Sequence, residues 1–378
     1  MTRNIWEIIR KDGWRYDLGR MLPHPSPYRG NIAYCQKPHI QSATATGVFQ
    51  FPGDYEEDGT GTAYLWHFVI KEWGLTSWIS GQTSYIGNYH PSMWNSNMKD
   101  QPPMFSFMAV WDKNGVDDLA RSINWKGQMK ADGTIADCDS EPEHCWTLFS
   151  EPAVLVAGQD SEIGIGLQDM IDSFDYSPQS DNACVQDLGN EGILVWHASW
   201  YRASPLYFSF AKKEDILKRD MYCHFAGWGA GFKPIWKQTD ETASRPVMAD
   251  RVGEFSVVFN QDRTYSFEVI FNHNDGGQSG FVIREALAPW GPFDKKIPVL
   301  DCLEMDTEFR AYSEDNPSDP NRPYYLFNPG GGCYGGYSHS KLLDGNDPDY
   351  PDKVLIRFNT SLWSPYKAVL METDLEKQ

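Results

Sequence analysis

The sequence predicts an all-β fold built from many antiparallel hairpins, and three observations lead to this class. Aromatic residues make up 14 % of the 378 residues, and the chain holds 32 Gly and 24 Pro, a composition typical of strands joined by tight turns. Runs of alternating apolar and polar residues recur along the chain, whereas helical periodicity is scarce. No strand–helix–strand alternation appears, which disfavours a parallel doubly wound sheet.

Strand patterns are found throughout the chain. They cover residues 62–73, 104–112, 192–201, 206–212, 254–260, 264–272, 280–286, 324–327, 354–360 and 366–374. In the run 264–272, Tyr265, Phe267, Val269 and Phe271 share one face and Glu268 lies on the other, the pattern of a half-buried strand. Only 4–11 and 212–220 predict helices, both short.

Turns of Gly, Asn, Asp and Pro separate these strands. The residue types of Asn274–Gly277 predict a hairpin turn, because Asn and Gly tolerate positive φ. So many antiparallel hairpins in a chain of 378 residues fit a propeller, a large sandwich or a barrel. Five four-stranded blades would use the length well, so we predict a five-bladed β-propeller with few short helices. No linker interrupts the chain, and residues 1–378 are expected to form a single domain.

The charge balance limits the partners. The formal net charge is -19, which disfavours nucleic acid and anionic membranes as partners. No apolar run is long enough to span a membrane. Residues 1–14 lack the apolar core of a signal peptide, so the start is that of a cytosolic protein or of a chain whose leader was removed. We expect a small apolar molecule or an oligosaccharide as the substrate, and the oligomeric state stays open.

The cysteines contain no CxxC pair, so a zinc ribbon is not expected. They are Cys35, Cys138, Cys145, Cys184, Cys223, Cys302 and Cys333. Cys138 and Cys145 flank an acidic loop and could close a short disulfide; separate reduced thiols are the alternative. A glycosylation triplet begins at Asn359. These features favour the secretory pathway or an extracellular location, and a cytoplasmic one stays open.

The C-terminal third carries a more specific pattern. Residues 252–260 read VGEFSVVFN, residues 281–293 read FVIREALAPWGPF, residues 333–342 read CYGGYSHSKL, and residues 355–375 close the chain. This order resembles a family of five-bladed β-propellers that includes endo-D-arabinanases, glycoside hydrolases of furanoside polymers. The resemblance covers roughly residues 251–375 and implies a propeller with a central site.

The first blade departs from that family. Where the hydrolases carry aspartates, this chain has Gly47 and the pair Trp66–His67. Glycoside hydrolysis needs two carboxyl groups, one that protonates the leaving oxygen and one that activates water or attacks the sugar. The usual pair is therefore expected to be lost.

Several residues are candidates for the site, and each has a structural alternative. Glu254 lies among apolar residues, where an acid acts as a general acid or is a buried structural group. Arg284 could grip an anionic or enolic oxygen, or form an ion pair with a neighbouring blade. The predicted catalytic residues are Glu254, His67, Arg284 and His339; the predicted substrate-binding residues are Trp66, His197, Trp228, Tyr334, Tyr337 and Trp363.

The glycine-rich run 328–342 is neither a phosphate cradle nor a linker, because no Lys-Ser/Thr follows it and aromatic residues interrupt it. The resemblance makes it the turn that enters the last blade. Gly335 and Gly336 would let the backbone approach the axis and place Tyr334, Tyr337 and His339 near the floor of a pocket.

Three functions compete. The first is a non-hydrolytic enzyme that cyclises or joins apolar natural-product intermediates, as fungal pericyclases of the hetero-Diels–Alderase type do; it works through proximity and a donor that polarises a carbonyl. The second is a furanoside glycoside hydrolase, and the third a non-catalytic carbohydrate-binding propeller. The missing aspartates favour the first. No cofactor and no metal are expected, because no motif for either is found.

Overall fold

The structure is a computed structural model. It describes residues 33–35, 40–54, 61–70, 104–112, 146, 151–161, 163–174, 183–198, 204–238, 241–260, 267–275, 278–294, 296–302, 333–338, 353–362 and 367–376. Within these residues nearly all regular structure is β-strand, every strand pairing is antiparallel, and no helix is long and apolar enough to cross a membrane. The all-β class is therefore confirmed.

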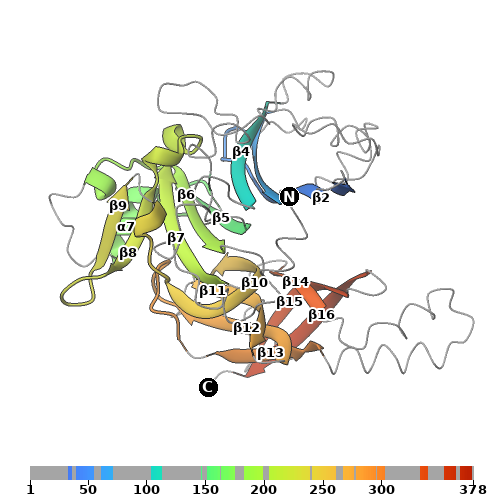
Figure 1. The fold of residues 1–378 in the computed structure, drawn as a ribbon. Helices are drawn as coiled ribbons and strands as arrows, with labels where there is room; N and C mark the ends of the chain where they lie inside the picture. Colours follow the sequence, from blue (N-terminus) through green and yellow to red (C-terminus); the bar gives the residue numbers. More distant parts are fainter. Residues whose placement is uncertain are drawn as a thin grey trace, which may run out of the picture.

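The strands form three sheets (Figure 1). The first has the order β1-β2-β3-β4, with β1 at Ala33–Cys35, β2 at Ile40–Phe49, β3 at Thr62–Ile70 and β4 at Met104–Asp112. The third has the order β14-β15-β16, with β14 at Cys333–Ser338, β15 at Lys353–Leu362 and β16 at Lys367–Glu376.

The second sheet has nine strands in the order β13-β12-β11-β10-β7-β6-β5, and β8 pairs with both β7 and β9. Its strands are β5 (Glu151–Ala157), β6 (Gly192–Ala198), β7 (Ser204–Lys212), β8 (Cys223–Trp228), β9 (Pro234–Gln238), β10 (Met248–Phe259), β11 (Phe267–Asp275), β12 (Gln278–Ala286) and β13 (Ile297–Asp301). Asp275 pairs with Gln278, so the predicted hairpin turn at Asn274–Gly277 is confirmed.

The early strands of successive groups contact one another. β2 contacts β5, β5 contacts β10, and β10 contacts β14. This succession is what blades arranged around an axis would produce. The described residues contain no closed barrel, and the number of five blades stays a prediction.

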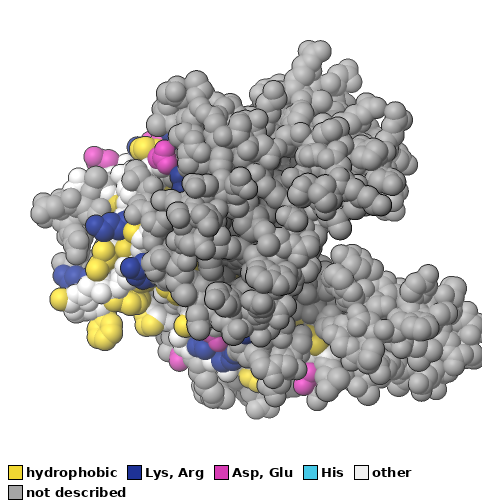
Figure 2. Space-filling model, in the orientation of Figure 1, with side chains coloured by type: hydrophobic (Ala, Val, Ile, Leu, Met, Phe, Trp, Pro, Cys, Tyr) yellow, Lys and Arg dark blue, Asp and Glu magenta, His cyan; other side chains and the backbone are white. Residues whose placement is uncertain are grey.

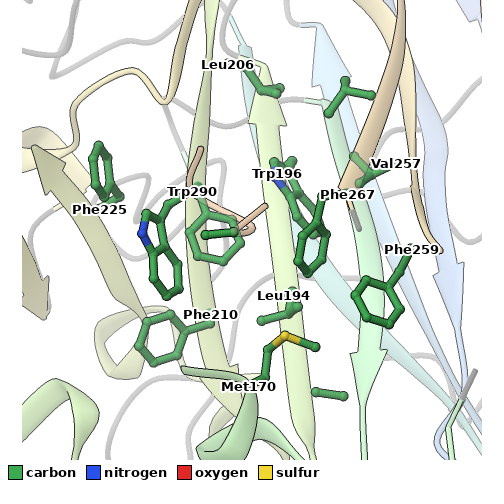
Figure 3. Close-up of a cluster of buried hydrophobic side chains, with 14 of the residues drawn as sticks. Met170, Leu194, Trp196, Leu206, Phe210, Phe225, Val257, Phe259, Phe267 and Trp290 are labelled. Carbon is green, nitrogen blue, oxygen red and sulfur yellow. The ribbon is translucent and has the colours of Figure 1, made fainter. Parts of the chain in front are cut away.

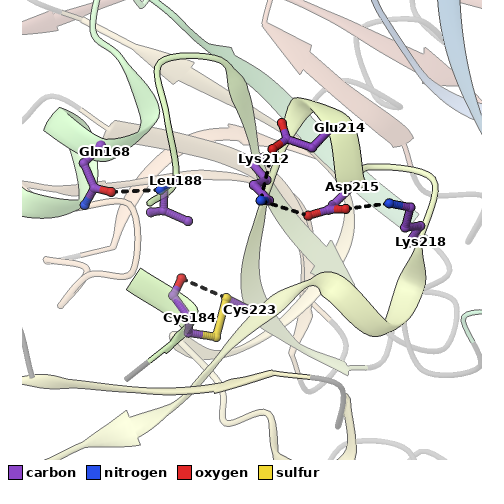
Figure 4. Close-up of polar contacts among 8 residues, drawn as sticks. All are labelled: Gln168, Cys184, Leu188, Lys212, Glu214, Asp215, Lys218 and Cys223. Carbon is purple, nitrogen blue, oxygen red and sulfur yellow. Dashed lines mark hydrogen bonds and ion pairs between the residues drawn. A yellow bond between two sulfur atoms is a disulfide. The ribbon is translucent and has the colours of Figure 1, made fainter. Parts of the chain in front are cut away.

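The helix predicted at 212–220 does not form, and the sequence did not predict the α-helix that the structure describes. The run 212–220 forms the short 3₁₀ turns η5 (Lys213–Asp215) and η6 (Arg219–Met221), because β7 continues through Lys212. Ion pairs from Asp215 to Lys212 and Lys218 hold these turns (Figure 4). The α-helix of the described chain is α7 (Leu167–Phe174), whose buried residues Leu167, Met170 and Ile171 have helical spacing. The predicted helix at 4–11 lies outside the described residues.

A large aromatic core packs on one face of the nine-stranded sheet (Figure 3). Trp290 lies in this core, with its ring centroid 5.1 Å from that of Trp236. The indole N–H of Trp196 donates to the carbonyl of Pro289 at 2.8 Å. The APWGPF segment therefore supplies a core ring and an acceptor, so this family-like motif stabilises the fold.

Both faces of the central strands are covered. Strand β6 is buried along its whole length; Leu194 and Trp196 face the large core, and Ile193 and Val195 face a second cluster that includes Trp66. In β11, Phe267 and Val269 lie in the large core as expected. Glu268 on the opposite face is also buried, so the half-buried pattern predicted there was wrong.

The cysteine expectation is corrected in part. A buried disulfide joins Cys184 in η4 (Ala183–Val185) to Cys223 at the start of β8 (Figure 4). Cys302 is also disulfide-bonded, whereas Cys138 and Cys145 lie outside the described residues. The triplet at Asn359 lies within β15, the middle strand of its sheet, and Asn359 is half-buried.

The glycine run enters the third sheet through β14. The amide of Ser338 donates to Ser256 Oγ of β10 at 2.8 Å, which attaches this strand to the nine-stranded sheet. A Cβ at Gly336 would lie 2.6 Å from ring atoms of Phe281. Gly336 is thus required for a close approach of the backbone to a core ring, as expected for a glycine in a strand.

Gly336→Ala is expected to destabilise the protein by about 1–3 kcal/mol, because the added methyl group overlaps the Phe281 ring. Urea unfolding measures the loss. Gly158→Ala is the matched control, because its Cβ would meet neighbours at ordinary distances of 3.7 and 3.8 Å. Equal stability of the two variants would contradict the close packing.

Candidate functional site

Five buried rings gather where the first sheet meets the second face of the nine-stranded sheet. We call Trp66, Trp146, His197, Tyr222 and His224 the aromatic–histidine cluster; each is at most 1 % exposed. Ring centroids lie 5.4 Å apart for Trp66 and Trp146, 5.5 Å for Trp66 and His197, and 4.6 Å for Trp146 and Tyr222. Edge-to-face and tilted contacts at these distances are favourable for aromatic rings.

Strand alternation places the polar members of this cluster on one face. His197 on β6 shares its face with Ile193 and Val195, and Ser209 on β7 pairs in register with His224 on β8. His197 Nε2 and Ser209 Oγ are 2.5 Å apart, a hydrogen bond whose direction depends on the imidazole tautomer. The sheet register therefore places two imidazoles and a hydroxyl against two indoles.

His197 is neutral near pH 7. Burial, and secondarily the nearby His224, lowers the pKa of His197 well below its usual value of 6.5. Burial also raises the pKa of Tyr222, whose hydroxyl donates to the carbonyl of Ile216 at 2.6 Å. Neutral imidazole is the form that accepts a proton or polarises a carbonyl.

One ion pair lies at the edge of the cluster. Arg219 Nη2 contacts Glu241 Oε1 at 2.5 Å, and the Glu241 side chain is 1 % exposed. The guanidinium carbon lies 6.0 Å from the centroid of the Trp146 ring, within the range of cation–π attraction. The negative charge of Glu241 is therefore compensated next to the rings.

The structure brings together two of the predicted binding residues, Trp66 and His197. Trp66 on β3 pairs with Gly47 on β2, so two of the positions that the resemblance singled out are neighbours. Glu254 is elsewhere, half-buried in a bulge of β10 between Val252 and Phe255. Its strand contacts β5 and β14.

The other described candidates lie outside the cluster. Arg284 is ion-paired to Asp250, with Nε and Oδ2 2.7 Å apart. Asp250 lies on β10 of the same sheet, so this is a structural ion pair but not the expected one to a neighbouring blade. Trp228 is 37 % exposed near the end of β8, and Tyr337 is 48 % exposed on β14. His339 and Trp363 lie outside the described residues, as do the side chains of His67 and Tyr334.

Sequence reasoning missed most of the polar surroundings. It did not single out Trp146, Ser209, Arg219, Tyr222, His224 or Glu241. The alternation Tyr222–Cys223–His224–Phe225, with Cys223 and Phe225 in the large core, is the one signal that could have indicated β8. Arg219 and Glu241 are far apart in sequence, and only the tertiary fold brings them together.

The cluster combines two indoles, two imidazoles, a phenol and a neighbouring hydroxyl. Its five rings pack on one another and are at most 1 % exposed, so they are core side chains. Among the residues that the structure describes, no three His, Cys, Asp or Glu side chains gather as metal ligands.

A family model described as "Domain of unknown function (DUF4185)" matches residues 158–372, more than half of the chain, so the chain belongs to this family. No curated protein matches it. Among solved structures, it is similar to Zg3597, a family 117 glycoside hydrolase produced by the marine bacterium Zobellia galactanivorans. The TM-score is 0.31 and the identity 9 %, over 89 % of this chain and 76 % of that one. A likeness of this size carries no argument about activity.

Folding stability is expected to fall as the pH drops below about 6.5, where the unfolded chain protonates His197 and the folded chain does not. Above that pH both states are neutral and this contribution is constant. In His197→Asn the free energy of unfolding should fall less steeply below pH 6.5. The difference in slope is at most that of one proton, about 1.4 kcal/mol per pH unit. Urea unfolding between pH 5 and 8 measures it, with pH 8 as the baseline; an unchanged slope in the variant would contradict the buried neutral imidazole.

Proposed function

We propose that this DUF4185 protein is a glycoside hydrolase that acts on furanoside oligosaccharides or polysaccharides, with Glu254 as its general acid. The single observation that carries the proposal is the position of Glu254. It is a half-buried carboxyl group on β10, the strand that contacts both β5 and the glycine-rich β14. The sequence motifs that resemble arabinanase-type propellers begin around this residue, which adds support.

A hydrolase needs a second carboxyl group, and the pairing of the strands indicates Glu151 as the candidate. Glu151 begins β5 and pairs with Ala198, the neighbour of His197. Ser204 begins β7 and pairs with Val252, two residues before Glu254. Both glutamates therefore lie toward the same end of the sheet, on two strands that contact each other. A spacing of about 5–5.5 Å between the carboxyl groups would retain the anomeric configuration, and about 6.5–9.5 Å would invert it.

A second candidate function is the joining of apolar intermediates by a pericyclase-type reaction. The neutral His197 and the compensated Glu241 favour it, because the described cluster is aromatic and mostly uncharged. Catalysis would then come from orientation of two reactants and from a donor to a carbonyl oxygen. This function is tested by incubating the protein with a terpene alkene and a quinone methide precursor, without any sugar, and measuring the joined product.

The disulfide between Cys184 and Cys223 supports a proposal on location. Disulfides persist in oxidising compartments and are rare in the cytosol. We therefore propose that the chain passes through the secretory pathway.

Glu254→Gln and Glu151→Gln should each lower kcat on arabinan fragments by about 10²–10⁴-fold, because each removes one proton-transferring carboxyl group. Release of reducing ends is the measurement. Glu214→Gln is the matched control, because this glutamate is 65 % exposed and pairs with Lys212. If the unsubstituted protein binds the fragments without releasing reducing ends, it is a carbohydrate-binding propeller and the hydrolase proposal fails.

A further inference from the structure

The hairpin of β8 and β9 carries exposed aromatic side chains at the edge of the nine-stranded sheet. Among the described strands β9 pairs with β8 alone, so the hairpin projects from the sheet (Figure 1). Phe232, between the two strands, is 85 % exposed, the highest value among the large apolar residues that the structure describes, and Trp228 at the end of β8 is 37 % exposed. Neither belongs to the aromatic–histidine cluster.

The tip of this hairpin is held in a defined shape. The amide of Gly229 donates to the carbonyl of Lys233 at 2.7 Å and closes the turn. Phe232 has a φ of 58°, a conformation that an aromatic residue rarely adopts. The ring of Trp228 packs edge-on against Phe225, which is fully buried in the large core, with 5.2 Å between centroids. The hairpin thus holds the Trp228 ring against a rigid base.

The charge of the hairpin is opposite to that of the protein. Residues 226–238 contain Lys233 and Lys237 and no Asp or Glu, although the whole chain has a formal net charge of -19. Neither lysine forms an ion pair within the part of the chain that the structure describes. Arg245 is exposed beside Gly227 of the same hairpin. Figure 2 shows hydrophobic and basic side chains gathered together at this end of the molecule, at the left of the view.

We propose that the β8–β9 hairpin docks on an anionic phospholipid surface. Phe232 has no polar atom and stands on a convex tip, a shape that enters a lipid interface and does not provide the flat platform on which a sugar ring stacks. Tryptophan prefers the interfacial depth at which Trp228 would then lie. Lys233 and Lys237 lie where they can pair with anionic headgroups.

The negative charge of the rest of the protein does not prevent this contact. Exposed charges are screened beyond about 8 Å at physiological ionic strength. A headgroup at the tip therefore experiences mainly the local cations. The proposal is independent of the reaction that the chain catalyses.

Co-sedimentation of the full chain with vesicles tests the proposal, using phosphatidylcholine alone and phosphatidylcholine with one fifth phosphatidylserine. We expect binding to the anionic vesicles. Phe232→Asp should weaken it at least about tenfold through lost apolar burial. The double variant Lys233→Glu, Lys237→Glu should weaken it at least about tenfold through lost headgroup attraction. Leu370→Asp is the matched control, because Leu370 is 64 % exposed on β16, away from the hairpin, and its binding should be unchanged.

Other occupants of the tip give distinguishable results. Absence of binding to anionic vesicles, or equal loss in Leu370→Asp, would overturn the proposal. A concentration-dependent dimer that Phe232→Asp abolishes, in a chain that ignores vesicles, would assign the tip to a second copy. Retention on insoluble polysaccharide, lost in Phe232→Asp without vesicle binding, would assign it to substrate and also overturn the proposal.

Discussion

Burial of the central strands on both faces is the constraint on which the rest of the structure depends. Strand β6 sends Leu194 and Trp196 into the large core and Ile193 and Val195 into the second cluster. A strand with two apolar faces must lie inside a layered structure, because an exposed face would leave these side chains in water. The first sheet covers the second face through Trp66, and this cover removes water from around His197. The depressed pKa of the imidazole is thus a consequence of the same burial that holds the sheets together.

The sequence predicted well what depends on neighbouring residues. The alternation of apolar and polar residues predicted the bounds of β4 correctly, and turn chemistry predicted the hairpin between β11 and β12. Both signals depend only on residues close together in the sequence. It failed where tertiary contacts decide. The run 212–220 has helix-forming residues, yet β7 extends through Lys212 to complete its pairing with Gly192. Glu268 was placed toward solvent because the alternation of one strand does not show that a further cluster covers its polar face.

The candidate site was harder to predict for the same reason. Trp66 and His197 were recognised singly, and their contact depends on how the first sheet packs on the second. Arg219 and Glu241 carry no local signature, because two 3₁₀ turns bring them together around Trp146. The motif around Trp290 carried part of the family resemblance, and its ring and the Pro289 carbonyl lie in the large core. A motif that recurs in a family can therefore preserve packing while the chemistry changes elsewhere.

The difference between residues that pack the core and residues that carry chemistry bears on the two candidate reactions. In the first sheet, Gly47 and Trp66 form a cross-strand pair, and Trp66 is fully buried against Trp146. A carboxylate could not occupy the Trp66 position without a partner, because an ionised group at such depth costs several kcal/mol, on the order of the stability of a domain. If the proposed hydrolysis occurs, its second acid must come from another strand, and β5 is one of the strands that contact β10. The burial of Trp66 therefore favours a catalytic pair on the strands that carry Glu151 and Glu254 over one on the first sheet.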